Sequence, residues 1–224
     1  MQYFPSVEGF NLDTFTGKVQ YLAHCDLDPI KFLIEQTEIT SSATIQMFGE
    51  NIRECDEKLD SYNSCENSSL MNIFSAKVIP LSYQSILLIM FSLFEEAMKT
   101  WCRMLKIENG AMEDFDSFMK GCHLGELERA IRYIENHSKM TNIEKDPLWD
   151  KIRSIRIARN AIVHNGGRVE EKNRKYLDKF KIGMREEDFS VYIDYDTIND
   201  MYNTIMGFLD GIFSQGVILE SEVK

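Results

Sequence analysis

The 224-residue chain contains only four prolines, and its five cysteines form no Cys-x-x-Cys pair. So little proline, with twelve glycines, leaves little room for long disordered linkers. An odd number of cysteines favours free thiols in a reducing compartment over a disulfide framework. The adjacent pairs His24-Cys25 and Cys122-His123 lack the spacing that zinc ligands need on one element. We therefore expect no metal site and no other cofactor.

The sequence also lacks an evident targeting or membrane segment. The first ten residues, MQYFPSVEGF, contain neither a basic start nor an apolar stretch. The most apolar run, residues 78–94, includes proline, glutamine and serines and is short for a bilayer span, which needs about 20 apolar residues. We expect this run to form a buried core helix, with no membrane as partner and a cytoplasmic location.

A net positive charge is absent as well, because the formal charge of the chain is −11. This balance argues against indiscriminate binding of nucleic acids. Yet residues 151–185 hold eleven lysines and arginines against three acids, so this segment carries +8 and the remainder −19. Two interpretations stay open for the basic segment: a solvated helix face, or a surface that binds a polyanion.

What the chain does contain is helical periodicity. With 44% hydrophobic and 27% charged residues, the composition is that of a soluble globular protein. The spacing of apolar residues, with proline at helix starts and glycine at helix ends, predicts helices over residues 28–62, 80–107, 113–120, 124–139, 146–164 and 194–215. Residues 62–69 are expected to form a polar loop, and Pro29 to lie in a first helical turn.

These elements predict an all-α bundle. Residues 188–195 alternate polar and apolar side chains as a short strand would, which suggests a small β-hairpin near residues 180–195. We expect an N-terminal helical extension of unclear role over residues 1–65, followed by a main helical domain over residues 66–224.

The helix expected over residues 146–164 carries unusual polar groups near its end. On a helical wheel with 100° per residue, Arg159 falls inside the apolar arc, where an unpaired guanidinium would be very costly. Arg156, Asn160 and His164 follow one another at spacings of four along the edge of that arc. Each residue taken alone is explained by helix packing or capping.

Taken together, residues 159–164, Arg-Asn-Ala-Ile-Val-His, resemble the signature of the HEPN superfamily (higher eukaryotes and prokaryotes nucleotide-binding). That signature is an arginine, a polar residue and a histidine near the end of a helix in an all-α domain. The apolar helix ending in FSLFEEAMKTW is similar to members of this group, and the resemblance covers residues 70–215.

The resemblance implies a HEPN-like helical bundle and a metal-independent endoribonuclease that acts as a homodimer. Its catalytic residues would be Arg159, Asn160 and His164, and the biological setting would be a toxin or antiviral-defence effector held by a cognate inhibitor or defence-system partner. Gly166 stands where some of these toxins carry a tyrosine, so a tyrosine-regulated subgroup is not expected.

The chemistry of the three side chains suits RNA cleavage. A histidine with a pKa near ~6.5 serves as base or acid, and the planar guanidinium of an arginine matches phosphate oxygens. Arg159 and His164 point about 140° apart on one ideal helix, which favours a site completed by a second copy. The basic residues expected to bind substrate are Arg156, Arg168, Lys172, Arg174 and Lys175. Glu95 and Glu96 are the expected structural partners of Arg159.

A rival interpretation from another class stays open. The same cluster would also suit a catalytically inactive HEPN-like helical dimer that binds a nucleotide or a partner protein, with Arg159, Asn160 and His164 as a packing network.

Overall fold

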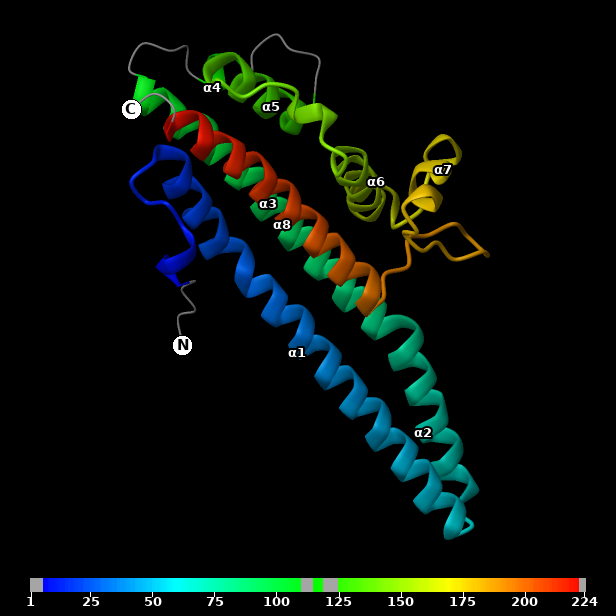
Figure 1. The fold of residues 1–224 in the computed structure, drawn as a ribbon. Coiled ribbons are helices and arrows are strands. Elements are labelled where there is room, and N and C mark those ends of the chain that lie inside the picture. Colours follow the sequence, from blue (N-terminus) through cyan, green and yellow to red (C-terminus); the bar gives the residue numbers. More distant parts are fainter. Residues whose placement is uncertain (1–5, 110–114, 119–124, 222–224) are drawn as a thin grey trace. The chain divides into compact units, whose positions relative to one another are not determined.

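The computed structural model describes residues 6–109, 115–118 and 125–221, and every regular element in these ranges is a helix (Figure 1). The all-α prediction is therefore confirmed for the described residues. In chain order the elements are η1 (Val7–Gly9), α1 (Phe15–Glu57), α2 (Ser61–Ile73), the π-helical η2 (Phe74–Val78), α3 (Ile79–Asn109), α4 (Phe115–Phe118), α5 (Glu126–His137), η3 (Ile143–Lys145), α6 (Trp149–Asn165), α7 (Glu171–Lys179) and α8 (Tyr195–Ser221).

Helix α1 begins well before the predicted start and runs through Pro29. A proline inside a helix costs about 3 kcal/mol, because it removes a backbone donor and crowds the preceding turn. An uninterrupted stripe of buried side chains outweighs that cost; its members are Val19, Ala23, Leu27, Ile30 and Ile34. The expectation that Pro29 lies in a first turn was wrong, because packing on both sides of the proline decides where the helix starts.

The predicted polar loop at residues 62–69 is instead part of α2. The Asp60 side chain caps this helix by accepting a hydrogen bond from the Asn63 backbone N–H at 3.3 Å. The chain continues through η2 into α3 without leaving helical conformation. Serine and asparagine favour loops only where nothing offsets their weak helix propensity, and here a cap and the contact between Phe48 and Phe74, at 6.3 Å between ring centroids, favour the helix.

The chain divides into two compact units, each assembled from separate segments. Unit 1 comprises residues 1–30, 89–156 and 201–224, and unit 2 comprises residues 31–88 and 157–200. Neither unit ends at residue 65, so the division into 1–65 and 66–224 stays a prediction. The start of α1 contributes buried side chains to unit 1.

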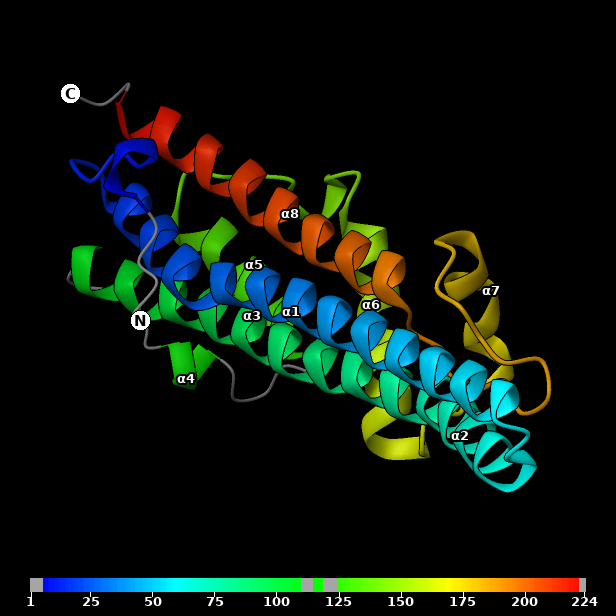
Figure 2. The ribbon, with the colours of Figure 1, turned by 90° about the horizontal axis from the view of Figure 1, so that it is seen from below.

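Unit 1 has an aromatic core. In it, segments of α1, α3 and α8 run side by side (Figure 2). The rings of Trp101 and Phe213 lie 4.7 Å apart, and Phe208 contacts both Phe94 at 6.1 Å and Trp149 at 5.6 Å between centroids. Each of these side chains is almost fully buried. Burying a side chain of this size contributes about 1.5–3 kcal/mol, so this cluster holds α3, α6 and α8 together.

Unit 2 combines the remaining part of α1 with α2, η2, the start of α3, the end of α6, α7 and the start of α8. Two side chains tie its segments together: Tyr83 donates to Glu38 Oε2 at 2.6 Å, and Gln84 Nε2 donates to the Val191 carbonyl at 2.9 Å. Burial and the hydrogen bond to Glu38 raise the pKa of Tyr83.

The expected hairpin near residues 180–195 is not formed as regular strands. Residues 168–191 contain two isolated antiparallel bridges, Arg168 with Ser190 and Met184 with Val191. The second turns the chain back on itself, and Phe189 adopts a left-handed conformation with φ 53° that interrupts strand geometry. The alternating pattern correctly indicated which side chains are buried, because Val191 and Ile193 are buried. Two isolated bridges are too few for a β-ladder.

The apolar run at residues 78–94 contributes to α3. By length and composition alone, the helical stretch Ser61–Ile107 could cross a membrane, and 39% of its most apolar window is buried within the protein. Ile86, Leu87, Met90, Phe91 and Phe94 are buried, whereas Val78, Leu81 and Ile89 are exposed. The run is therefore buried on one face only, and the prediction of a buried core helix is confirmed in part.

Candidate functional site

Helix α6 presents the candidate residues between two well-defined ends. At its start, Asp146 Oδ1 accepts the Leu148 backbone N–H at 2.8 Å, as a helix-capping side chain does. At its end, Gly166 and Gly167 both have positive φ, and the Gly167 N–H donates to the Ala161 carbonyl at 2.9 Å. The glycine pair therefore ends the helix at Asn165, one residue after His164, and turns the chain toward α7.

Arg159 is half-buried, in agreement with its place in the apolar arc of the wheel. Its Nη1 donates to Asn160 Oδ1 at 2.9 Å. Its Nε is buried and has no hydrogen-bond partner among the described residues. Leaving a charged donor unsatisfied costs free energy, so this guanidinium retains bonding capacity that the described part of this chain does not use.

His164 is exposed, and it lines a hollow of about 280 Å³ together with Asn160. The hollow is also lined by Ile157, Ala161, Asn165, Val169, Glu170 and Asn173. Arg159 is not among the lining residues, although its bond to Asn160 places it directly beside them. Asn160 and His164 thus line one hollow, whereas Arg159 lies outside the lining and is bonded to Asn160.

Three polar lining residues were not among the residues predicted from the sequence: Asn165, Glu170 and Asn173. They follow His164 closely in the sequence, and the turn at Gly166 and Gly167 returns α7 to the side of α6. Glu170 is partly neutralised by Lys172, whose Nζ lies 2.7 Å from Glu170 Oε2. The glycine pair was the signal that could have identified them.

Arg156 does not take part in this hollow. Its Nη1 and Nη2 donate to the two oxygens of Glu128, both at 2.6 Å, in a bidentate pair whose side chains are 24% and 16% exposed. Burial raises the pKa of Glu128, but the hydrogen bonds and charge of Arg156 outweigh it, so the net direction is downward. The guanidinium fork is thus occupied within the chain, and the expectation that Arg156 binds substrate stays a prediction.

The other basic residues expected to bind substrate lie in unit 2 and differ in their surroundings. Arg168 is exposed, and Lys172 pairs with Glu170. The Arg174 guanidinium lies 3.5 Å from the centroid of the Phe189 ring, and Lys175 Nζ lies 5.2 Å from that of Tyr176. The segment therefore pairs cations with aromatic rings, which its charge alone did not predict.

Of the two expected acidic partners of Arg159, Glu96 is paired elsewhere. Glu96 Oε1 accepts from Arg103 Nη1 at 2.6 Å, within α3. Asn160 takes the place expected for an acid beside the guanidinium. Glu95 has a polar or electrostatic interaction of its own, and its assignment to Arg159 stays a prediction.

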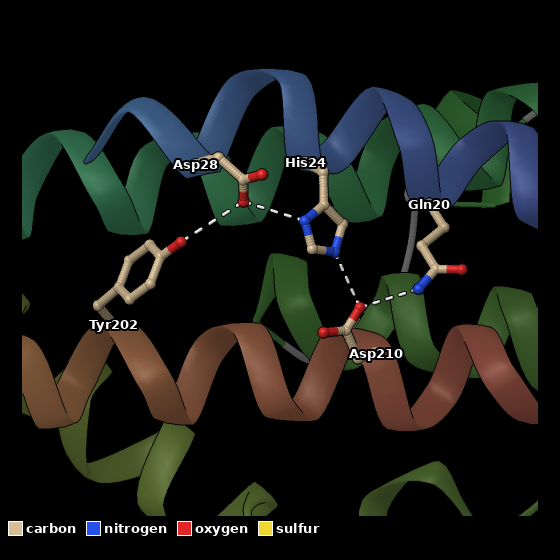
Figure 3. A network of polar contacts seen from close by, with 5 residues as sticks. All are labelled: Gln20, His24, Asp28, Tyr202 and Asp210. Carbon is tan, nitrogen blue, oxygen red and sulfur yellow. Dashed lines mark hydrogen bonds and ion pairs between the residues drawn. The ribbon is translucent and has the colours of Figure 1, made fainter. Parts of the chain in front are cut away.

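A second polar cluster lies in unit 1, around a histidine that carries no sequence motif (Figure 3). His24 Nδ1 lies 3.0 Å from Asp28 Oδ1, and His24 Nε2 lies 2.9 Å from Asp210 Oδ1. Gln20 donates to the same oxygen of Asp210 at 2.9 Å, and the Tyr202 hydroxyl lies 3.5 Å from Asp28. Both ring nitrogens face carboxylates, so the cluster favours the imidazolium form and joins α1 to α8.

The titration of this cluster follows from its geometry. Burial lowers the pKa of His24, but the hydrogen bonds and charges of Asp210 and Asp28 outweigh burial, so the net pKa is raised. Burial raises the pKa of Asp210, but the hydrogen bonds from His24 and Gln20 outweigh burial, so the net pKa is lowered. Because both ring nitrogens of His24 are paired, this histidine links α1 to α8 and does not serve as a base for substrate.

The described cysteines 25, 55, 65 and 102 are free thiols. Burial raises the pKa of Cys102, so this thiol is unreactive. In the part of the chain that the structure describes, no group of three or more His, Cys, Asp or Glu side chains could hold a metal ion. The pair Cys122-His123 lies outside the described residues.

No protein-family model, curated protein or solved structure matches the chain.

Proposed function

We propose that the protein is a metal-independent endoribonuclease of the HEPN type, acting in the cytoplasm as a homodimer. The observation that carries this proposal is the arrangement at the end of α6, where Asn160 and His164 line one hollow and Arg159 bonds to Asn160. These are the three residues that the resemblance designates, and each has a chemical role in that arrangement.

In the proposed reaction, His164 removes the proton from a ribose 2′-hydroxyl, and the 2′-oxygen attacks the adjacent phosphorus. The bond to the 5′-oxygen then breaks, and that oxygen takes a proton from an imidazolium. The products are a 2′,3′-cyclic phosphate and a free 5′-hydroxyl, so the step consumes no metal and no further reactant. Exposure of His164 at the hollow gives the imidazole the access to substrate that this role requires.

Arg159 and Asn160 would stabilise the negative phosphorane. The Asn160 carbonyl oxygen accepts from Arg159, so its amide nitrogen remains to donate to a phosphate oxygen in the hollow. The buried Nε of Arg159 retains unused bonding capacity. Since Arg159 does not line the hollow of its own chain, a second copy related by a two-fold axis would supply the arginine to each site.

The setting of a toxin or antiviral-defence effector, held by a cognate inhibitor or defence-system partner, is part of the same proposal. A second function is favoured by one observation: the half-burial of Arg159 and its bond to Asn160 also suit a packing network. In that case the protein is a catalytically inactive helical dimer that binds a nucleotide or a partner protein.

Incubation with total RNA in EDTA separates the two functions. The proteins compared are wild type, His164→Ala, Arg159→Ala and the control Arg53→Ala, which removes an exposed arginine of α1. We expect wild type and the control to degrade RNA, and the two site variants to lose at least about a hundredfold in rate.

Equal RNA decay in all four proteins would exclude catalysis by this cluster. If no protein degrades RNA and Arg159→Ala melts at lower temperature than Arg53→Ala, the packing function is the correct one. Analysis of the RNA ends tests the chemistry, because a 2′,3′-cyclic phosphate forms only by attack of the neighbouring hydroxyl.

A further inference from the structure

Unit 2 contains a second hollow, of about 450 Å³, on the segment that follows the candidate site. Its lining residues are Arg174, Asp178, Lys181, Ile182, Gly183, Met184, Arg185, Glu186 and Phe189. We infer that this hollow binds a phosphate and the adjoining nucleotide of a single-stranded RNA. The inference rests on the proposed function, because it names where the substrate strand is held beside the cleavage site.

Arg174 is the first cation of the hollow. Its guanidinium stacks on Phe189 at 3.5 Å from the ring centroid, and its Nε is buried without a hydrogen-bond partner among the described residues. Stacking fixes the plane of the guanidinium, and because Arg174 lines the hollow we expect its terminal N–H groups to be within reach of a ligand there. A flat cation on an aromatic ring, with an unsatisfied donor, is the arrangement that a phosphate would complete.

Lys181 is the second cation, and it occupies a position that glycine would fill more stably. It follows α7 with φ 56°, its N–H donates to the Asp178 carbonyl, and the Ile182 N–H donates to the Leu177 carbonyl. This pair of bonds defines a helix end at which glycine is preferred, because other residues cost about 1 kcal/mol in the left-handed conformation. A lysine at this cost is explained if its charge is used in the hollow.

Phe189, which also lines the hollow, shows the same feature. Its φ of 53° is rare for a bulky residue, and the residue is still 40% exposed. Strained residues of this kind gather where function requires a fixed side chain. Two strained residues thus line one hollow, one supplying a cation and the other an aromatic surface on which a base can stack.

The third cation is Arg185, held from two sides. Its Nη2 donates to the Ala76 carbonyl at 2.8 Å, and its guanidinium lies 5.9 Å from the ring centroid of Tyr192, which is 36% exposed. These contacts orient the side chain and use only part of its donor capacity. Arg185 and Tyr192 therefore extend the alternation of cations and rings.

The two acids of the hollow favour RNA over an acidic protein segment. Asp178 and Glu186 offer only acceptors when ionised, and they would repel a peptide carboxylate without compensation. A nucleotide supplies both kinds of group, since its phosphate accepts from the cations while base amino groups and the 2′-hydroxyl donate to the carboxylates. The mixed lining thus matches a nucleotide better than an anion alone.

The two hollows are neighbours on one helix. Asn173 lines the hollow of His164 and Arg174 lines the second hollow, and these residues are consecutive on α7. Consecutive Cα atoms are about 3.8 Å apart and their side chains diverge by roughly 100° on a helix. One RNA strand crossing α7 would therefore occupy both hollows. Binding in the second hollow would then determine which nucleotide lies beside His164.

The test measures binding of a fluorescent single-stranded RNA oligomer by anisotropy. The full chain with His164→Ala is the parent, so that cleavage does not interfere. Lys181→Gly and Arg185→Gln are added together, and the matched control adds Arg53→Gln and Lys58→Gln, which remove the same charge from an exposed part of unit 2. Thermal melts check that all proteins are folded.

We expect the dissociation constant to rise about tenfold for the paired variant, and the slope of log affinity against log salt to become shallower by about 1.4. In the control, the dissociation constant and the salt slope should change only by the small amount that the lower net charge of the protein produces. Lys181→Gly alone should raise the melting temperature while weakening RNA binding, a combination that a merely structural lysine would not produce.

Equal affinity and salt slope in the paired variant and the control would overturn the inference, as would a parent that binds no RNA. Equal binding of polyglutamate at the same ionic strength would overturn it in favour of an acidic protein partner. If wild type cleaves RNA and the paired variant does so equally well, the inference fails while the proposed function stands. If the paired variant binds RNA more weakly but wild type never cleaves RNA, the proposed function fails while the inferred RNA-binding hollow stands.

Discussion

At the scale of single residues, Asn160 has two roles that substitution can separate. Its Oδ1 accepts from the half-buried Arg159, while its amide nitrogen is left for the hollow. Asn160→Asp keeps the acceptor and adds a charge opposite the guanidinium, so the free energy of unfolding should stay the same or rise. The lost donor and the new negative charge should lower the rate of RNA cleavage about a hundredfold.

Urea unfolding and RNA decay measure these two effects. Asn160→Ala is the companion variant, because it removes the acceptor as well and should cost about 1–2 kcal/mol of stability. Full cleavage activity in Asn160→Asp would contradict the proposed role of the amide.

The residue His24 gives the protein a specific pH dependence. Its pKa is raised from 6.5, so the contribution of the cluster to stability is complete below that value and is lost as pH rises through the folded-state pKa. The pKa of Asp210 is lowered from 3.8, so its contribution is complete above that value and is lost as pH falls through the lowered pKa. The cluster is therefore most stabilising between about pH 4 and 6.5.

His24→Gln should remove this dependence. We expect the free energies of unfolding of wild type and variant to differ most near pH 5.5 and to converge above neutral pH. The difference should be about 1 kcal/mol, because Asp210 is partly exposed and solvent screens the pair. Urea unfolding at several pH values measures it, and a difference that grows with rising pH would show that the sign is wrong.

At the scale of elements, the ends of α6 were predictable while those of α1 and α2 were not. Asp146 and the pair Gly166-Gly167 act through their own backbone neighbours, so their effects can be derived from a short stretch of chain. Pro29 and the polar residues 62–69 were misleading, because packing elsewhere outweighs a local preference of a few kcal/mol.

Two glycines in unit 2 provide a matched test of these local rules. A Cβ at Gly166 or Gly49 would meet no described atom within 4 Å, so only backbone conformation distinguishes the two sites. Gly166 has φ 59°, and Gly166→Ala should cost about 1 kcal/mol. Gly49 lies inside α1, and Gly49→Ala should stabilise by about 0.5–1 kcal/mol.

Urea unfolding of the two variants should thus give shifts of opposite sign. A stabilised Gly166→Ala would mean that the turn after α6 does not require the left-handed conformation. In that case the placement of Asn165, Glu170 and Asn173 around the hollow would lose its explanation.

At the scale of the whole molecule, the central question is whether two chains form each site. Arg159→Ala and His164→Ala are each expected to be inactive alone. In a dimer with shared sites, mixing them creates heterodimers in which one site has both residues intact. About a quarter of wild-type RNA cleavage should return at equal concentrations.

RNA decay after unfolding and refolding the mixture together measures this recovery, and light scattering at micromolar concentration measures the dimer itself. Activity confined to wild type, with a monomeric mass, would mean that a single chain forms the site. Without co-refolding, activity should return only as fast as the homodimers dissociate and exchange subunits.

Sequence alone was sufficient for features that depend on near neighbours in the chain. Spacing and local backbone chemistry account for the helical class, the end of α6, the arc position of Arg159 and the basic segment at residues 151–185. The tertiary structure decided everything that depends on distant partners. In the tertiary structure Arg156 pairs with Glu128, and His24 lies between Asp28 and Asp210. The Arg174 guanidinium stacks on the Phe189 ring. These contacts could not be derived from periodicity, because burial and electrostatic pairing between separate segments of chain determine which polar groups remain available.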